Sequence, residues 1–95
     1  MEKRVVITGL GAVTPVGIGK DAFYEALLAG KSGIGPITHF DASEYATRIA
    51  GEVKDFDITQ YGVEKKESRR MDRSSQFAIA AAVLALRDSN LDLDK

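Results

Sequence analysis

With 95 residues, the chain is long enough for at most one small domain, and its hydrophobic content of 44% is ordinary for a globular protein. A formal net charge of −1 gives no overall attraction to nucleic acid or to a membrane surface, and no stretch approaches the ~18 apolar residues of a membrane-spanning helix. Because the chain contains no cysteine, its own residues offer no disulfide, no thiolate metal site and no thiol catalysis.

The first predicted element is a strand over residues 4–8. Val5, Val6 and Ile7 form a continuous apolar run that stops at a Gly-Leu-Gly turn, residues 9–11. A strand that is apolar at successive positions is buried on both faces, as in the middle of a helix-covered parallel sheet. Such a strand needs pairing neighbours and two covering layers, which 95 residues scarcely supply. We therefore expect the chain to be the opening part of a larger α/β protein.

A first helix follows the glycine-rich connection over residues 9–20. Asp21 suits the N-cap position, and the residues after it are good helix formers. Phe23, Ala26 and Leu27 fall on one helical face. Gly30 is typical of the position just after a helix C-terminus, so we expect the helix to end there.

The middle of the chain shows weaker patterns. Residues 31–47 have no sustained period and predict an ordered loop. Residues 48–54 predict a second, more exposed strand, with Ile49 and Val53 on one face. Residues 57–61 predict one short helical turn, ended by a glycine.

The most regular pattern belongs to the last helix. Asp72 or Ser74 suits its N-cap, and residues 77–86 are apolar without interruption. Because this helix is apolar around its whole circumference and rich in alanine, neighbours can approach it closely from several directions. The pattern predicts a helix in the centre of a large layered fold.

Seven short segments resemble a known family in order and spacing. They are Arg-Val-Val-Ile-Thr-Gly-Leu-Gly (4–11), Thr-Pro-Val-Gly (14–17), Leu-Leu-Ala-Gly-Lys-Ser-Gly-Ile (27–34), His-Phe-Asp (39–41), Tyr-Ala-Thr (45–47), Ala-Gly-Glu-Val (50–53) and Arg-Arg-Met-Asp-Arg (69–73). Together they resemble the N-terminus of the β-ketoacyl-acyl-carrier-protein synthases, most closely the bacterial type II elongating enzyme. The likeness covers essentially the whole chain.

The resemblance implies a thiolase-like α-β-α-β-α layered fold, of which residues 1–95 are the N-terminal portion of the first half. Such enzymes are cytoplasmic homodimers that join an enzyme-bound acyl thioester to malonyl-acyl carrier protein with loss of carbon dioxide. In the family, the catalytic cysteine and two catalytic histidines lie far beyond residue 95. His39 matches the His-Phe-Asp segment and neither catalytic position. We therefore predict no catalytic residue in this chain, no cofactor and no metal site, and an isolated chain that is inactive.

Other parents remain open at this point. A polyketide ketosynthase and its cysteine-lacking chain-length partner share this opening. A downstream cysteine with two histidines would separate a synthase from a chain-length partner. The chain could also be a free-standing, non-catalytic module that binds carrier protein, and binding by the isolated chain would favour that alternative.

The run over residues 64–73 is the candidate partner surface. It contains five basic residues against three acidic ones, so its net charge is +2, whereas the remainder of the chain is −3. If the run is helical, Lys65 and Arg69 share one face, and Lys66 and Arg70 share the adjoining one. An ordinary solvated face with Lys–Glu pairs is the alternative. The resemblance implies docking of acyl carrier protein through these four residues, with Lys66, Arg69 and Arg70 leading.

A nucleotide site is the first competing interpretation. Gly9 and Gly11 follow an apolar run, as in dinucleotide-binding turns, but Thr14 stands where the third glycine of that pattern belongs. Pro15 then breaks the helix whose N-terminus would hold a pyrophosphate. We interpret the two glycines as allowing a tight turn and close backbone packing.

Two further sets of polar residues could in principle serve in catalysis, namely the single histidine and the paired aspartates. A lone histidine such as His39, with no second histidine or cysteine, is usually a hydrogen-bonded loop residue, and we favour that interpretation over a general base or a metal ligand. The paired carboxylates, Asp55 with Asp57 and Asp92 with Asp94, stand two residues apart with no cleft to hold them. Acid–base catalysis and glycoside hydrolysis therefore find no support.

Overall fold

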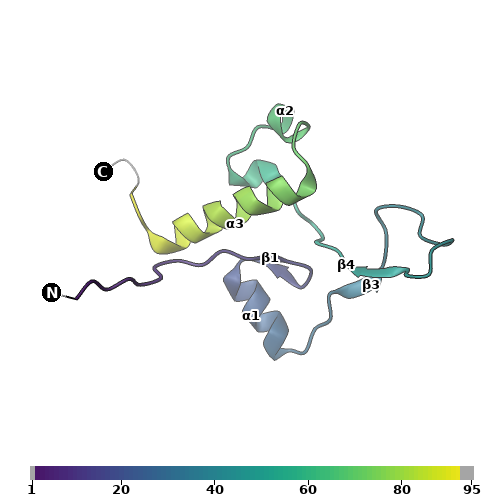
Figure 1. Cartoon of the computed structure of the whole chain (residues 1–95), viewed down its shortest axis with the longest axis horizontal. Helices are drawn as coiled ribbons and strands as arrows, with labels where there is room; N and C mark the ends of the chain where they lie inside the picture. Colours follow the sequence, from purple (N-terminus) through teal and green to yellow (C-terminus); the bar gives the residue numbers. More distant parts are fainter. Residues whose placement is uncertain (1, 93–95) are drawn as a thin grey trace. The chain divides into compact units, whose positions relative to one another are not determined.

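The computed structural model describes residues 2–92, and its contacts divide the chain into two compact units. The first unit contains the segment up to Ala12 and the chain from Asp57 onward, and the second contains Val13–Phe56. Figure 1 labels the helices and strands. In chain order they are β1 (Val13–Thr14), β2 (Gly17–Ile18), α1 (Lys20–Leu28), β3 (Ile34–Pro36), β4 (Ile49–Gly51), the 3-10 turn η1 (Ile58–Tyr61), α2 (Lys65–Ser68) and α3 (Arg73–Ser89).

Helix α3 is the scaffold of the first unit. The Asp72 carboxylate accepts a hydrogen bond from the backbone N–H of Ser75 at 2.8 Å, so Asp72 is the N-cap, as one of the two predicted candidates. The helix ends at Asn90, whose φ of 56° places it in the left-handed region. A local signal in the sequence therefore located the start of this helix.

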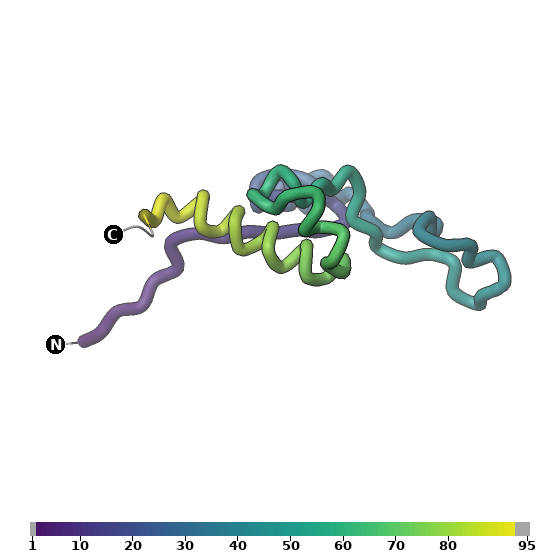
Figure 2. Tube along the Cα trace, turned by 90° about the horizontal axis from the view of Figure 1, so that it is seen from above, coloured from purple at the N-terminus to yellow at the C-terminus, as the bar shows by residue number. Residues whose placement is uncertain are grey.

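The predicted strand over residues 4–8 is not formed. The segment is a continuous extended trace in Figures 1 and 2, but it has no hydrogen-bonded partner strand among the described residues. Val5 is 96% exposed and Ile7 is 82% exposed. The apolar pattern that predicts a strand is present, but a strand also needs a neighbouring strand for its backbone groups, and residues 2–92 do not provide one.

Beyond that run, the chain passes closely along α3. The backbone N–H of Leu10 donates to the Asp88 carboxylate at 2.9 Å. A Cβ at Gly9 would overlap the carbonyl oxygen of Ala85, and one at Gly11 would overlap that of Ala81. The two glycines therefore allow close backbone packing as predicted, in an extended segment and not in a tight turn.

One side of α3 stays open within the first unit. Ala80 is fully buried, whereas Ile79 and Leu86 are 36% and 39% exposed, and Ala78 and Ala82 are exposed as well. The helix is therefore covered on the side that meets the glycine segment and η1, and it keeps exposed apolar residues elsewhere on its surface.

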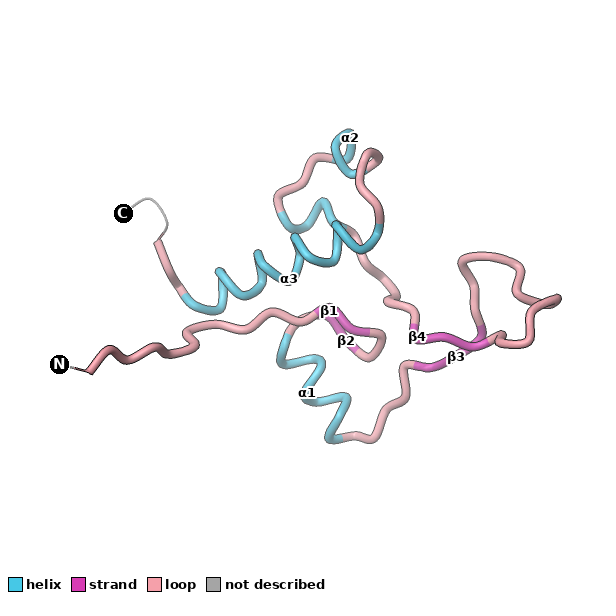
Figure 3. The backbone as a smooth tube through the Cα atoms, viewed as in Figure 1, coloured by secondary structure: helices cyan, strands magenta, loops and turns pink. Residues whose placement is uncertain are grey.

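In the second unit, a small hairpin leads into α1 (Figure 3). Strands β1 and β2 pair antiparallel, with Val13 opposite Ile18. The predicted N-cap at Asp21 is wrong: Gly19 precedes the helix with φ 92° and ψ 150°, a conformation suited to glycine, and no side chain caps the turn. Asp21 instead lies in the first turn, where its negative charge complements the helix dipole.

The C-terminus of α1 matches its prediction. Gly30 has a φ of 69°, and its backbone N–H donates to the Leu27 carbonyl at 3.1 Å. The N–H of Lys31 donates to the Ala26 carbonyl at 3.0 Å. This pair of bonds is the Schellman arrangement, which satisfies carbonyls that the helix itself leaves free.

Strands β3 and β4 form a second antiparallel pair, with Ile34 opposite Gly51 and Pro36 opposite Ile49. The predicted loop over residues 31–47 is therefore wrong at Ile34–Pro36, because a three-residue strand containing glycine and proline leaves no periodic signal. The predicted strand over residues 48–54 is confirmed only at Ile49–Gly51. Since it ends there, alternation does not continue: Val53 is buried, whereas Ile49 is exposed.

The short turn η1 is confirmed where it was predicted. The Asp57 carboxylate accepts from the backbone N–H of Thr59 at 2.9 Å, and Gly62 ends the turn with a φ of 85°. Few side chains are buried, and most of them are small. The buried hydrophobic residues are Ala26, Ala42, Val53, Ile58 and Ala80.

Candidate docking surface

The candidate surface is built on α2, a single helical turn. The backbone N–H of Ser68 donates to the Glu64 carbonyl at 3.0 Å, and the Ser68 hydroxyl donates to the Lys65 carbonyl at 2.6 Å. Arg69 is the C-cap, and the N–H of Arg70 still donates to Glu67 at 3.0 Å. The helix is therefore shorter than the run that the sequence analysis considered, but the chain keeps turning through Arg70.

The turn is held against the first unit at defined points. The Gln76 side chain on α3 donates to the Ser68 carbonyl at 3.2 Å. Helix α2 also packs against η1, which packs against α3. The Arg87 guanidinium donates to the Gln60 carbonyl at 3.3 Å and lies 5.7 Å from the centre of the Tyr61 ring. These contacts give α2 a fixed base while its charged side chains stay in solvent.

All four predicted basic residues are exposed. Lys66 and Arg70 line one hollow together with Glu64 and Glu67. Lys65 and Arg69 lie outside that lining. Within residues 2–92, none of the four basic side chains forms an ion pair with an acidic one, so their positive charges remain available to a partner.

Lys65 lies near Asp57, the N-cap of η1, whereas Lys66 lines the hollow. Hydrogen bonds from the Thr59 hydroxyl and backbone lower the pKa of Asp57, and the nearby positive charge of Lys65 lowers it further. Lys65 is therefore close enough to η1 to feel an acidic group there, although the two side chains do not form an ion pair.

The last two residues of the run, Asp72 and Arg73, contact the start of α3. Hydrogen bonds from Ser75 and Ser74 to Asp72 lower the pKa of that carboxyl, which caps α3. The Arg73 guanidinium lies 5.0 Å from the centre of the Phe77 ring, within the range of a cation–π contact. Asp72 and Arg73 therefore stabilise the start of α3.

His39 belongs to a hydrogen-bonded loop. The Glu52 carboxylate accepts from the Thr38 hydroxyl at 2.8 Å, from the Thr38 N–H at 3.1 Å and from the His39 N–H at 3.2 Å. The His39 Nε2 atom lies 3.5 Å from the same carboxylate. This arrangement agrees with the structural interpretation of His39. No local sequence pattern indicates this role of Glu52, because its partners lie thirteen and fourteen residues away.

The hydrogen bonds of this loop also affect the pKa of Glu52. Desolvation, the largest single effect, raises the pKa of Glu52, but the hydrogen bonds from Thr38 and His39 together bring it below its usual value. A carboxylate that accepts several hydrogen bonds and has a lowered pKa holds a loop well and is a poor general acid.

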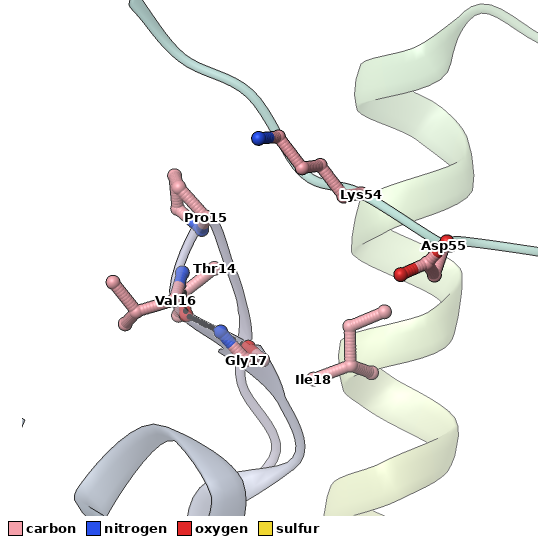
Figure 4. Close-up of a pocket in the computed structure, with 7 residues that line it drawn as sticks. All are labelled: Thr14, Pro15, Val16, Gly17, Ile18, Lys54 and Asp55. Carbon is pink, nitrogen blue, oxygen red and sulfur yellow. Dashed lines mark hydrogen bonds between the residues drawn. The ribbon is translucent and has the colours of Figure 1, made fainter. Parts of the chain in front are cut away.

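A second hollow, which the sequence analysis did not anticipate, lies in the second unit (Figure 4). It is lined by Thr14, Pro15, Val16, Gly17, Ile18, Lys54 and Asp55. The Thr14 hydroxyl is committed to the turn, since it donates to the Gly17 carbonyl at 2.7 Å and accepts from the Gly17 N–H at 3.0 Å. The Thr14 hydroxyl is therefore not free to act as a nucleophile in this hollow.

Asp55 and Asp57 do not form a catalytic pair. Asp57 is committed to capping η1, and Asp55 is an exposed residue with a φ of 57°. Asp92 is exposed, and Asp94 lies outside the described residues. Over residues 2–92, no group of three or more His, Cys, Asp or Glu side chains is placed to hold a metal ion. No helix in that range has the length and apolar character to cross a membrane.

Comparison with known proteins gives a consistent result. The family "Beta-ketoacyl synthase, N-terminal domain" matches residues 2–95. The chain is 50% identical over 94 residues to 3-oxoacyl-[acyl-carrier-protein] synthase 2 of Synechocystis, a match that covers 99% of this chain and 22% of that protein. It is also 50% identical over 92 residues to the Granaticin polyketide putative beta-ketoacyl synthase 1 of Streptomyces violaceoruber. That match covers 97% of this chain and 22% of the relative.

The backbone also matches a solved structure. The ishigamide ketosynthase/chain length factor superposes with a TM-score of 0.83 at 36% sequence identity, over 94% of this chain and 22% of that one. The mixed α/β structure thus corresponds to part of a ketosynthase. The chain spans about a fifth of the length of the proteins that it matches.

Proposed function

The chain belongs to the family of β-ketoacyl synthase N-terminal domains, and on this basis we propose that its residues form the N-terminal portion of a larger condensing enzyme of fatty-acid elongation. The observation that carries this proposal is the family match over residues 2–95, together with 50% identity to a 3-oxoacyl-[acyl-carrier-protein] synthase 2. The enzyme would work as a cytoplasmic homodimer, as the bacterial type II enzymes do.

The proposed reaction joins an acyl group, held as a thioester on an enzyme cysteine, to malonyl-acyl carrier protein with loss of carbon dioxide. The chain has no cysteine, and its single histidine lies in the Glu52 loop. The nucleophile and the two histidines that stabilise the developing negative charges would therefore come from the rest of the enzyme. By itself the 95-residue chain is predicted to be inactive.

The part played by this segment is to supply scaffold and surface. In a thiolase-like α-β-α-β-α layered fold, further strands and helices would cover the apolar run at Val5–Ile7 and the open side of α3. The high exposure of Val5 and Ile7 in the structure supports this role, because exposed runs of large apolar residues mark interfaces.

The second part of the proposal concerns the partner. Lys65, Lys66, Arg69 and Arg70 would dock the acidic acyl carrier protein that presents the acyl and malonyl groups. Their exposure and the lack of ion pairs to them from the described residues 2–92 support this role, as does a local charge of +2 on a chain that is otherwise −3. Complementary charge of this kind speeds and orients association more than it strengthens the final complex.

A hybrid enzyme tests the proposal. The chain replaces the matching 94 residues of the Synechocystis relative, and condensation with malonyl-acyl carrier protein is measured. We expect the hybrid to condense at a rate within about tenfold of the parent, because a correctly packed N-terminal portion leaves the downstream catalytic residues in place. A hybrid that folds and dimerises but does not condense would contradict the proposal. The same hybrid with its downstream cysteine replaced by alanine is the control.

A polyketide enzyme is the second candidate. The 50% identity to the granaticin relative and the backbone match to a ketosynthase/chain length factor both favour it. The part of the protein beyond residue 95 separates these cases. A cysteine with two histidines there indicates a condensing enzyme, and their absence indicates a chain-length partner. Turnover of short reduced acyl chains against poly-β-keto chains then separates the two pathways.

A further inference from the structure

The hollow beside α2 contains two glutamates for which the fold gives no role. Glu64 and Glu67 line it together with Lys66 and Arg70. Glu64 occupies the N-cap position of α2, but its side chain makes no capping hydrogen bond. Within residues 2–92, neither carboxylate forms a side-chain hydrogen bond or an ion pair. The two exposed carboxylates therefore lie beside the two cations of the hollow without an ion pair to either.

From this arrangement we propose that Glu64 and Glu67 are specificity-determining residues, which make the surface accept a protein with separately placed acidic groups and reject uniformly anionic polymers. The inference rests on the proposed docking function. An anion that approaches the hollow meets charges of both signs. A folded partner can place one carboxylate beside Lys66 or Arg70 and leave the positions facing the glutamates uncharged. A polyanion cannot do so, and it meets repulsion as well as attraction.

The size of this effect follows from elementary electrostatics. In water at low salt, a unit charge about 8 Å from a bound anionic group changes the binding constant about 2.3-fold. Two glutamates therefore weaken the binding of a polyanion about fivefold. At 0.15 M salt, where the screening length is about 8 Å, the same two charges weaken it only about twofold.

The test uses Glu64→Gln/Glu67→Gln, which removes two charges and keeps side-chain size. Binding of acyl carrier protein and of poly-glutamate is measured by fluorescence anisotropy, in the 95-residue chain and in the hybrid enzyme. We expect poly-glutamate to bind about fivefold more tightly at low salt and about twofold more tightly at 0.15 M salt. We expect the affinity for carrier protein to change less than twofold. Equal gains for the two ligands, or no gain for poly-glutamate, would overturn the inference.

Two further variants separate this inference from the docking function. Glu25→Gln/Glu44→Gln changes the net charge by the same amount at exposed positions in the second unit and should leave both affinities unchanged. Lys66→Glu/Arg70→Glu should weaken carrier-protein binding about 30-fold at low salt. If this second variant binds carrier protein normally, the docking function fails, and the inference fails with it. If it binds weakly while the glutamine variant behaves as wild type, only the role of the glutamates is wrong.

Discussion

At the scale of single residues, Gly11 is the clearest case of a glycine that permits close backbone packing. The backbone at Gly11 passes so close to α3 that an added Cβ would overlap the carbonyl oxygen of Ala81 and would lie 2.8 Å from the backbone nitrogen of Ala85. Both neighbours are backbone atoms of a helix, which cannot turn aside as a side chain can. The absence of a side chain at Gly11 is therefore a packing requirement.

The corresponding prediction compares two glycine substitutions. Gly11→Ala should lower the free energy of unfolding of the hybrid enzyme's N-terminal portion by about 1–3 kcal/mol, because the helix or the segment has to shift. Gly35→Ala is the matched control, since a Cβ there would have no heavy atom within 4 Å. It should leave stability unchanged or raise it slightly. Urea midpoints report both values, and equal effects of the two substitutions would contradict the packing argument.

At the scale of elements, the α2 surface carries the prediction that matters most for function. Arg69→Glu/Arg70→Glu in the hybrid enzyme should raise the KM for acyl-carrier-protein substrates about tenfold at low salt with little change in kcat, because the charges act on association and not on the reacting groups. The difference should shrink as salt is added. Lys31→Glu/Lys54→Glu makes the same charge change at exposed positions of the second unit and serves as the control. A KM that does not respond to Arg69→Glu/Arg70→Glu would remove the docking surface.

Helix ends could be predicted from the sequence because their causes are local. Gly30, Asp57 and Asp72 each satisfy or permit backbone hydrogen bonds within a few residues of their own position. Asp21 misled the prediction because a glycine conformation two residues earlier starts the helix just as well. A local signal thus fixes that a helix ends or begins, and competition among neighbouring residues decides where.

The strands and the candidate site were predicted less well than the helix ends. The run at residues 4–8 has a strand pattern but no partner, whereas Ile34–Pro36 lacks a pattern and pairs with β4. For the site, the sequence identified the charged run, but it could not show that Lys66 and Arg70 share a hollow with two glutamates. Strand pairing depends on residues that are distant in the sequence, and a local pattern does not contain it. The four residues that line the hollow are close in the sequence, but the charge pattern does not say which of their side chains line it together.

At the scale of the whole molecule, the small buried core limits what this chain can do by itself. Its buried hydrophobic residues are mostly alanines, and among the described residues no large side chain is fully buried. Val5, Val6 and Ile7 are 96%, 67% and 82% exposed. Burying three such side chains would contribute roughly 5–9 kcal/mol, which is similar to the total stability of a typical domain.

A lysine at position 6 tests whether this apolar run is enclosed in the larger enzyme. In the 95-residue chain, Val6→Lys should leave the far-UV circular dichroism and the urea profile unchanged, because the side chain is already in solvent. In the hybrid enzyme the same change should cost several kcal/mol, since it would bury an unpaired charge in a strand covered on both faces. Glu2→Lys, at an exposed position just before the run, should be harmless in both proteins. If Val6→Lys is equally harmless in the hybrid, or if the unmodified 95-residue chain melts in one sharp cooperative transition, the run does not depend on a surrounding fold for its role.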